Sequence, residues 1–381
     1  MRIALVHEFL NQLGGAEKVL QNFLEIWPAS AKASAGKPDT SVVHTIFYNK
    51  EKTLGQFEHV QKKVSFLNNW PMAQKHPRLF WALMPSAIES FKFDDFDVVL
   101  SDSTSFAHGA KTRGKLHICY YNTPTRFLWT DADYIKQQKY PRVMREIGSL
   151  LLPQMRKWDL KASKRPDFLI ANSLNVQKRI EKFYHRDSVV IPPPVDTKFF
   201  QPTGEKQGYF LAASRLEPYK KVDLVVEAFG ELGLPLKVIG TGTVFDQLKA
   251  MAKPNIEFLG RVSDEDLRQY YSGAKAYVFP AEEDAGITVI EAQACGTPVL
   301  AYGVGGSLET IKEGVTGEFF REQTAQSIIN AVKSFDAAKY NPAEIRKNAE
   351  QYDKVIFQKK IKDFVEGKVN GWKGSKGGNG L

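Results

Sequence analysis

Short apolar runs alternate with stretches of helical spacing through the first half of the chain. Five runs have the length and composition of buried strands: Ile3 to Val6, Val42 to Phe47, Val98 to Leu100, Leu116 to Tyr121, and Phe168 to Ala171. After the first run, the residues from Ala16 to Trp27 repeat apolar side chains at the spacing of a helix face. Because apolar strands separated by helices are typical of parallel sheets covered on both faces, the pattern predicts an α/β domain.

The same alternation begins again after a stiff segment of three prolines, Pro192 to Pro194. Helices are predicted from Val222 and from Asp264, where Ser263 is a natural N-cap. Five further runs have the character of strands: Tyr209 to Ala212, Lys237 to Ile239, Ile256 to Leu259, Ala276 to Phe279, and Pro298 to Ala301. We therefore expect two domains, residues 1–191 and 192–353, followed by a helix at 354–370 and a disordered tail at 371–381 that is rich in Gly and Lys.

Composition bounds the class of protein and its partners. The 381 residues are 43% apolar and 25% charged, which is ordinary for a globular protein with two cores. A net charge of +9 favours acidic partners such as phosphates, nucleic acid or an anionic membrane surface. The two cysteines have no metal-ligand spacing, and no apolar run approaches the length of a membrane span. We expect a cytoplasmic protein, either free or peripheral on the cytoplasmic face of the membrane.

In the second half, charged residues follow strands at two places. Arg215 and Lys220 lie on the loop that enters the helix from Val222, and two cations beside a helix start favour a diphosphate. The segment E-D-A-G-I-T-V-I-E places Glu283 on a loop, Gly286 at a close backbone approach and Glu291 on the next helix. Surface charge and a solvated acidic loop are the alternatives for these two places.

Two more loops after strands carry glycine. Gly240-Thr241-Gly242 is a G-x-G turn, but Phe245 stands where a dinucleotide fingerprint needs a third glycine, so that interpretation fails. Gly260-Arg261-Val262 follows the next strand. Because the carboxyl ends of parallel strands meet at one edge of a sheet, four such loops predict one site for phosphate and hydroxyl groups.

The first half offers three weaker candidates. Gly14-Gly15 forms a turn between strand and helix, where a ligand or a plain tight turn fits equally well. The loop from Asn122 to Trp129 follows a buried strand and includes Arg126. The stretch Arg142–Arg165 is basic and amphipathic, which fits either docking on an anionic membrane or a solvated helix face.

These motifs together resemble the family-four retaining glycosyltransferases. The resemblance rests on G-G-A-E near residue 15, R-x4-K at Arg215, G-R-V at 260, E-E-D-x-G-I-T at 282 and E-A-Q-A-C-G-T-P-V at 291, and it covers nearly the whole chain. It implies the GT-B fold, with two Rossmann-like domains facing across a cleft and the last helix crossing back to the first domain. The chain is most similar to mannosyltransferase-like members that build bacterial lipopolysaccharide or other cell-surface polysaccharide.

The resemblance also implies roles for residues at matching positions. Arg215 and Lys220 would neutralise the departing nucleoside diphosphate, and Glu283 would hold hydroxyls of the donor sugar. Donor-binding positions would be Gly15, Gly240, Val262, Gly286, Ile287 and Glu291. GDP-mannose is the favoured donor, a UDP-sugar is possible, and no metal or other cofactor is expected. The acceptor would be a glycan or a lipid-linked glycan, with Asn122 and Arg126 contacting a sugar.

Some positions depart from the family pattern, and rival functions stay open. Asn122 stands where the family commonly has His, so it can hydrogen-bond a hydroxyl but cannot act as a base. Ala285 and Val289 replace a usual aromatic residue and a usual proline, which puts the identity of the donor sugar in question. A metal-dependent glycosyltransferase that uses Asp131 and Asp133, a nucleic-acid-binding protein and an inactive scaffold are the alternatives.

Overall fold

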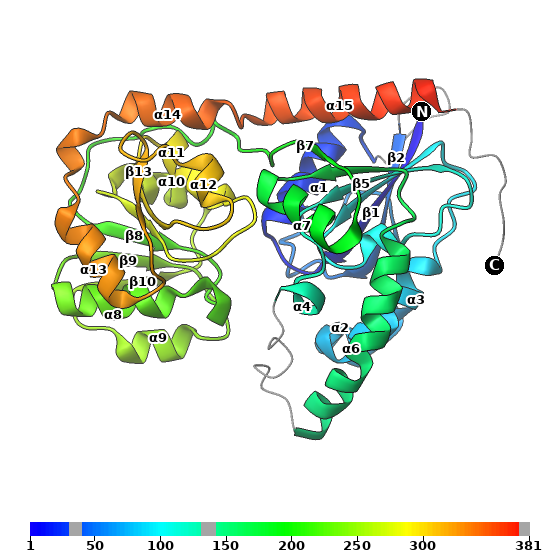
Figure 1. Ribbon diagram of the computed structural model, residues 1–381, viewed down its shortest axis with the longest axis horizontal. Coiled ribbons are helices and arrows are strands. Elements are labelled where there is room, and N and C mark those ends of the chain that lie inside the picture. Colours follow the sequence, from blue (N-terminus) through cyan, green and yellow to red (C-terminus); the bar gives the residue numbers. More distant parts are fainter. Residues whose placement is uncertain (30–39, 131–141, 373–381) are drawn as a thin grey trace. The chain divides into compact units, whose positions relative to one another are not determined.

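The structure is a computed structural model that describes residues 1–29, 40–130 and 142–372, and the chain divides into two compact units (Figure 1). The first unit consists of Met1–Pro192 together with the residues from Gln358 onward. The second unit is Pro193–Phe357. The division after Pro192 lies one residue beyond the limit expected from the proline run.

Within the described residues, the first unit contains a seven-stranded parallel sheet in the order β3-β2-β1-β4-β5-β6-β7. The order reverses between β1 and β4, so the connections on the two sides of this point run in opposite directions. Its strands are β1 Arg2–Leu10, β2 Thr40–Tyr48, β3 Lys62–Val64, β4 Val98–Ser103, β5 Leu116–Tyr121, β6 Phe168–Ala171 and β7 Val189–Val190.

Helices cover this sheet on both faces. Ala4 and Val6 of β1 pack in a buried cluster with Ile88 on one face, while Tyr120 of β5 packs edge-on against Phe23 on the other face. The helices are α1 Gly15–Ile26, η1 Phe66–Asn69, α2 Pro71–Lys75, η2 Pro77–Leu83, α3 Met84–Glu89, η3 Ala107–Gly109, α4 Arg126–Trp129, α6 Arg142–Ala162, α7 Leu174–Tyr184 and α15 Lys354–Gly371.

The last helix, α15, packs on the first unit. Gln358 Nε2 donates to Asn22 Oδ1 at 3.0 Å on α1, and Phe364 packs edge-on against Phe168. Lys368 Nζ lies 4.2 Å from the centre of the Phe168 ring. The helix was expected at 354–370 and ends at Gly371, so the expected tail begins too early; residues 373–381 lie outside the described part of the chain.

The second unit has, among its described residues, a six-stranded parallel sheet in the order β10-β9-β8-β11-β12-β13. Here the order reverses between β8 and β11. Its strands are β8 Phe210–Ala213, β9 Leu236–Ile239, β10 Ile256–Gly260, β11 Tyr277–Phe279, β12 Val299–Tyr302 and β13 Gly317–Phe320.

The helices of the second unit lie in two layers, with α8, α9 and α13 on one face of the sheet and α10 and α11 on the other (Figure 1). Alternation along β8 accounts for both layers, since Phe210 packs with the α8 layer and Leu211 packs with the α11 layer. The helices are η4 Pro218–Lys220, α8 Val222–Leu232, α9 Phe245–Met251, α10 Asp264–Gly273, α11 Ile287–Ala294, α12 Ser307–Thr310, α13 Ala325–Ser334, η5 Ala337–Lys339 and α14 Pro342–Glu350.

Local sequence explains where helix α10 begins. Ser263 caps α10 because its hydroxyl accepts the backbone N–H of Asp266 at 3.1 Å, as its position predicts.

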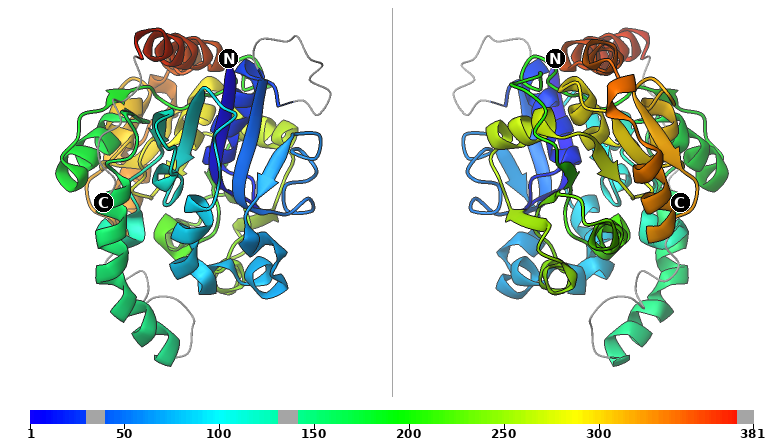
Figure 2. Two further views of the ribbon diagram at one scale, coloured as in Figure 1. Left: turned by 90° about the vertical axis from the view of Figure 1, so that its right-hand side faces the viewer. Right: turned by 90° about the vertical axis from the view of Figure 1, so that its left-hand side faces the viewer.

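The long helix α6 extends away from the body of the first unit (Figure 2). No helix in residues 1–29, 40–130 or 142–372 is long and apolar enough to cross a membrane.

Candidate functional site

The centre of the candidate site in the second unit is the point where the strand order reverses, between β8 and β11. The helices that follow these two strands lie on opposite faces of the sheet, so the loops at the carboxyl ends diverge and leave a crevice. Ser214, Lys220 and Ala281 are among the residues that line a hollow at this place. The expected phosphate loop and the expected acidic loop therefore flank the same crevice.

Arg215 and Lys220 both lie on the loop after β8. The loop closes with η4 and with Lys221 in the left-handed region at φ 55°, and then α8 begins at Val222. Its backbone is tied to the neighbouring loop after β9, because Leu216 N–H donates to the Thr241 carbonyl at 2.9 Å. The loop is therefore held on the sheet edge by its own main chain.

An ion pair joins the two loops across the crevice. Lys220 Nζ donates to Glu283 Oε1, and the two side chains are only 14% and 19% exposed. Lys220 Nζ also lies 5.1 Å from the centre of the Tyr219 ring. Lys220 and Glu283, 63 residues apart in the sequence, thus form the charged centre of this edge.

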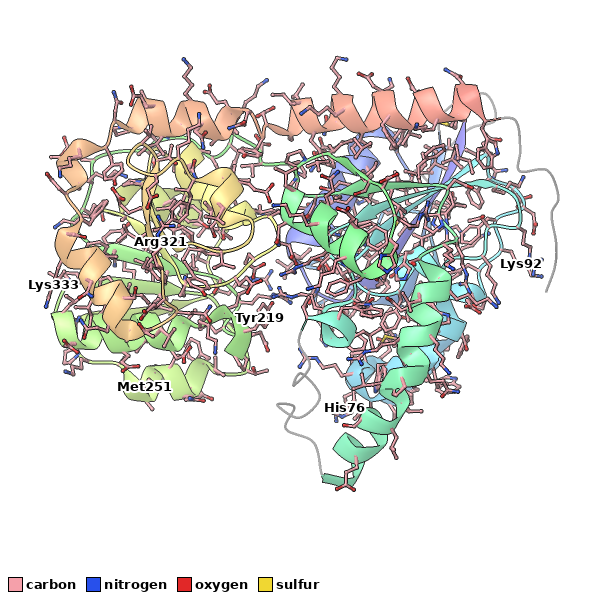
Figure 3. All side chains as sticks on the ribbon, viewed as in Figure 1. His76, Lys92, Tyr219, Met251, Arg321 and Lys333 are labelled. Carbon is pink, nitrogen blue, oxygen red and sulfur yellow. The ribbon has the colours of Figure 1, made fainter. Side chains whose placement is uncertain are left out.

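Arg215 lies on the same loop with a different partner. Its guanidinium donates to the Tyr219 hydroxyl at 2.8 Å, on the exposed side of the loop. Tyr219 is labelled in Figure 3, where its side chain projects from the segment ahead of α8. Tyr219 thus contacts both cations, a role that the sequence motif did not indicate.

The Glu283 loop is positioned by main-chain pairing with the loop after β12. Gly306 N–H donates to the Glu283 carbonyl at 2.8 Å, and an isolated bridge joins Glu283 to Gly305. Gly286 caps α11 at φ 66°, and its N-terminal residue is Ile287. A side chain at Gly305 would place its Cβ 2.5 Å from the Glu283 carbonyl oxygen, so only glycine fits there.

Glu291 lies within α11 and is buried, with 2% of its surface exposed. The Tyr271 hydroxyl lies 3.5 Å from Glu291 Oε2. Tyr277 of β11 donates to the Ala213 carbonyl at 2.8 Å, which links the ends of β8 and β11. Burial raises the pKa of both tyrosines, so both hydroxyls stay protonated donors. The predicted contact of Glu291 with a ribose stays a prediction.

Gly240 has a structural task in this unit. It has φ 132°, and a Cβ there would lie 1.8 Å from the Ser214 carbonyl oxygen. Gly242 is likewise pressed against the backbone of Leu216. The G-x-G turn therefore allows the loop after β9 to support the Arg215–Lys220 loop. Val262 follows β10 and packs at the margin of the core, and its contact with a base stays a prediction.

The first unit has a second charged cluster, where its own strand order reverses between β1 and β4. His7 Nδ1 lies 2.9 Å from Asp102 Oδ2, and His7 Nε2 lies 3.6 Å from Glu17 Oε1. All three side chains are buried. Burial alone would lower the pKa of His7, but hydrogen bonds to Asp102 and Glu17 outweigh it and raise that pKa to about 10.

The predicted sugar contact Asn122 is part of this cluster. Its Nδ2 donates to Asp102 Oδ1 at 2.5 Å, and its side chain is half-buried. Burial raises the pKa of Asp102 to about 6, while His7 and Asn122 oppose the rise, so Asp102 is ionised at neutral pH. Arg126 begins α4 on the same loop and is half-buried; its sugar contact stays a prediction.

Glu8, next to His7, fills the anion site at the end of β4. Its Oε1 accepts the backbone N–H groups of four consecutive residues, at 2.8 to 3.0 Å: Thr104, Ser105, Phe106 and Ala107. Such a row of N–H groups commonly binds phosphate. In this protein the chain's own carboxylate takes that place.

Gly15 is the first residue of α1, and Glu17 lies in the same first turn. Glu17 Oε1 accepts from Gln12 Nε2 at 3.1 Å, so a carboxylate already lies beside this helix start. Glu17 is the last residue of the G-G-A-E motif, for which no role of its own is predicted, and the motifs do not include His7 or Asp102. The available signal is that polar residues follow the apolar part of two strands, at His7 in β1 and at Asp102 in β4.

The basic stretch Arg142–Arg165 forms α6 and the residues after it. Arg156 Nε donates to the Leu128 carbonyl, and Arg165 pairs with Glu89, so these two cations are used inside the unit. Among the side chains of this stretch that the structure describes, the exposed cations are Lys157, Lys161 and Lys164. Asp131 and Asp133 lie outside the described residues. In the part of the chain that the structure describes, no group of three or more His, Cys, Asp or Glu side chains could hold a metal ion.

Two family models match successive parts of the chain. The model described as "Glycosyltransferase Family 4" matches residues 42–199, and the one described as "Glycosyl transferases group 1" matches residues 195–352. The second match contains both loops that flank the crevice of the second unit.

Two curated relatives illustrate the sequence similarity. The D-inositol 3-phosphate glycosyltransferase of Geodermatophilus obscurus is 30% identical over 185 residues, which are 40% of this chain and 41% of that protein. The GDP-mannose-dependent monoacylated alpha-(1-6)-phosphatidylinositol monomannoside mannosyltransferase of Corynebacterium glutamicum is 29% identical over 198 residues, 44% of this chain and 52% of that protein. The matched segment thus spans about half the length of these relatives.

Solved structures share the architecture over nearly the whole chain. The Anabaena protein HepE in complex with UDP superposes with a TM-score of 0.70 at 16% identity, covering 96% of this chain and 100% of that one. Sucrose-phosphate synthase from Thermosynechococcus elongatus gives 0.71 at 16% identity, covering 97% and 100%. At this identity the similarity establishes the fold, the two-domain GT-B arrangement of parallel sheets.

Proposed function

Because the chain belongs to the family-four glycosyltransferases with the GT-B fold, we propose that it is a retaining hexosyltransferase. Its donor is a nucleotide sugar, and its acceptor is a glycan or a lipid-linked glycan of a cell-surface polysaccharide such as lipopolysaccharide. We propose GDP-mannose as the donor, so the transferred sugar would be mannose. In support, one relative is named a GDP-mannose-dependent mannosyltransferase, while the solved relative HepE is complexed with UDP or UDP-glucose.

The observation that carries the proposal is the Lys220–Glu283 pair across the crevice of the second unit. Breaking a sugar–phosphate bond builds negative charge on the leaving diphosphate and positive charge on the sugar ring. A fixed Lys220 ammonium, with Arg215 on the same loop, stabilises the leaving group more in the transition state than in the ground state. The Glu283 carboxylate, which pairs with Lys220, would accept hydrogen bonds from sugar hydroxyls in this proposal.

This arrangement supplies cationic side chains where another enzyme would use a metal ion, so we propose a metal-independent reaction. Retention without a carboxylate nucleophile follows if the acceptor hydroxyl attacks from the face of the leaving group. The acceptor oxygen then forms the new bond to the anomeric carbon as the bond to the diphosphate breaks. The departing phosphate oxygen takes the acceptor's proton.

The experiment is a panel of GDP- and UDP-sugars tested for thermal stabilisation and for slow hydrolysis of the donor. A ligand bound only by the native state raises the melting temperature by mass action, and a hundredfold excess over Kd stabilises by about 2.7 kcal/mol. Glu283→Gln, which keeps the shape but loses the ion pair with Lys220, is expected to weaken the stabilisation. No shift with any sugar of the panel would contradict the proposed function.

A lipid-linked acceptor places the enzyme at a membrane surface, and we include peripheral docking on the cytoplasmic face through Arg142–Arg165 in the proposal. The cations available for it are Lys157, Lys161 and Lys164, beside Leu150, which is 79% exposed. Each cation near an anionic surface contributes about 1 kcal/mol before screening by salt.

Co-sedimentation with vesicles containing phosphatidylglycerol, compared with phosphatidylcholine alone, tests this docking at low salt. The triple variant Lys157→Glu, Lys161→Glu, Lys164→Glu is expected to lose the preference for anionic vesicles. Reversal of three exposed lysines of the second unit, Lys249, Lys333 and Lys339, is the matched control. Equal binding of the two vesicle types by the unaltered protein would contradict the proposed docking.

A further inference from the structure

The buried cluster in the first unit determines which end of the Asn122 amide is offered to a ligand. Asn122 Nδ2 lies 2.5 Å from Asp102 Oδ1. A carboxylate can only accept hydrogen bonds, so the NH2 end of the amide must face Asp102. Asp102 is 1% exposed, which places that end of the amide on the inner side.

Asp102 is itself held in place by the imidazole of His7. One carboxylate oxygen faces His7 Nδ1 at 2.9 Å, and the other accepts from Asn122. His7 Nε2 faces the carboxylate of Glu17 at 3.6 Å. With a carboxylate at each ring nitrogen, His7 donates from both, and the direction of the Asp102 carboxylate is set by two fixed partners.

The main chain of Asn122 is clamped as well. Its N–H donates to the Ser103 carbonyl at 2.9 Å, and its carbonyl accepts from Asn172 Nδ2 at 2.9 Å. Across residues 1–29, 40–130 and 142–372, no group donates a hydrogen bond to Asn122 Oδ1. Oδ1 is thus the side-chain acceptor of this half-buried residue that is left for a ligand, while Nδ2 is turned toward Asp102.

We propose that Asp102 is a positioning residue: anchored by His7, it turns Asn122 so that Oδ1 accepts a hydrogen bond from a sugar hydroxyl. The hydroxyl belongs to the transferred sugar or to the acceptor, and the proposal rests on the glycosyltransferase function given above. An anionic group is disfavoured here, because the carboxylates of Asp102 and Glu17 flank His7 and the buried carboxylate of Glu8 lies against the residues after β4.

Exchanging the two side chains tests the proposal. In Asp102→Asn, the new NH2 group faces Asn122, whose amide must turn and offer NH2 to the ligand. In Asn122→Asp, assayed at about pH 8, two ionised carboxylates face each other and repel. The double variant Asp102→Asn/Asn122→Asp restores one donor facing one acceptor and again leaves an oxygen for the ligand.

Steady-state kinetics of nucleoside diphosphate release are measured, GDP from GDP-mannose and UDP from UDP-glucose, using water and then methyl α-mannoside as acceptors. Each single variant is expected to lower kcat/KM by about tenfold to a hundredfold, and the double variant to regain most of the loss. A change already seen with water assigns the hydroxyl to the donor sugar; a change confined to methyl α-mannoside assigns it to the acceptor. Asp97→Asn, at the opposite end of β4, removes a similar charge and is the matched control.

A double variant no more active than the single variants, although folded, would overturn the proposal. A second readout does not depend on transferase activity: the side-chain NH2 resonances of Asn122 in ¹⁵N-labelled protein. We expect them to shift in Asp102→Asn and to stay unchanged in Asp97→Asn. Unchanged resonances in Asp102→Asn would refute the positioning role. Absence of turnover in the unaltered protein, with the expected shift present, would count against the proposed function alone.

Discussion

Raising the pH from about 7 to 8.5 is expected to destabilise the first unit through one buried side chain, His7. Its imidazole lies between the carboxylates of Asp102 and Glu17, and these raise its pKa from the ordinary 6.5 to about 10 despite burial. The folded protein therefore keeps a proton that the unfolded chain releases. The resulting stability is fully present below about pH 6.5 and is lost as the pH rises through about 10.

The magnitude follows from the linkage between proton binding and folding. Since one pKa unit corresponds to about 1.4 kcal/mol, the free energy of unfolding should fall by about 2 kcal/mol between pH 7 and 8.5. Asp102, whose pKa is about 6, titrates below this window. Burial raises the pKa of Cys119, so the folded protein keeps the thiol proton that the unfolded chain loses at higher pH. Above pH 8.5 this thiol would also lower the free energy of unfolding, so the measurement ends at pH 8.5.

Urea unfolding followed by tryptophan fluorescence isolates the relevant unit, because all six tryptophans of the chain belong to the first unit. His7→Gln should be less stable throughout and should lose the slope between pH 7 and 8.5. His59→Gln, at an exposed histidine of the same unit, should keep it. Equal slopes in the unaltered protein and in His7→Gln would show that His7 is not an imidazolium and would refute the reasoning.

Three further outcomes test the second unit. Lys220→Ala and Arg215→Ala should each raise the activation barrier by about 2–4 kcal/mol, whereas Lys221→Asn on the same loop should not; near-normal kcat in the first two would contradict the diphosphate role. In thermal unfolding, Gly240→Ala should cost about 3 kcal/mol of stability, because its Cβ would lie 1.8 Å from the Ser214 carbonyl oxygen. Gly233→Ala also has an unfavourable positive φ but nothing within 4 Å of its Cβ, so it should cost about 1 kcal/mol. Turnover should survive EDTA, and loss that Mg²⁺ or Mn²⁺ restores would favour the metal-dependent alternative.

Periodicity predicted most of the described strands and missed β3 and β13. The limits of β5 and β6 agree with the apolar runs Leu116 to Tyr121 and Phe168 to Ala171. The strand β3 lies at the edge of its sheet with two exposed residues, so it has no apolar run to detect. The strand β13 begins at Gly317, whose absent Cβ allows contact with the Val299 backbone, and glycine argues against a strand in the sequence alone.

The candidate site was predictable in part, for a reason of topology. Motif spacing identified Lys220 and Glu283 separately, but their pairing depends on β8 and β11 being neighbours at the point of reversal. No local pattern expresses that neighbourhood. The same holds for Asn122 and Asp102, which lie 20 residues apart on the ends of β5 and β4 and meet only because those strands pair.

The two units share the order 3-2-1-4 at the reversal of their sheets, yet the side chains at the two reversals differ. In the second unit two cations, Arg215 and Lys220, lie on the loop after β8, and Lys220 pairs with Glu283. In the first unit the carboxylates of Asp102 and Glu17 flank His7, and Glu8 fills the N–H row that a phosphate would use. A common topology therefore predicts where ligands bind but not which. In the proposed function the second unit binds the phosphate groups and the first unit binds hydroxyl-bearing groups, so binding of the donor's diphosphate should depend on Lys220 and not on Asp102.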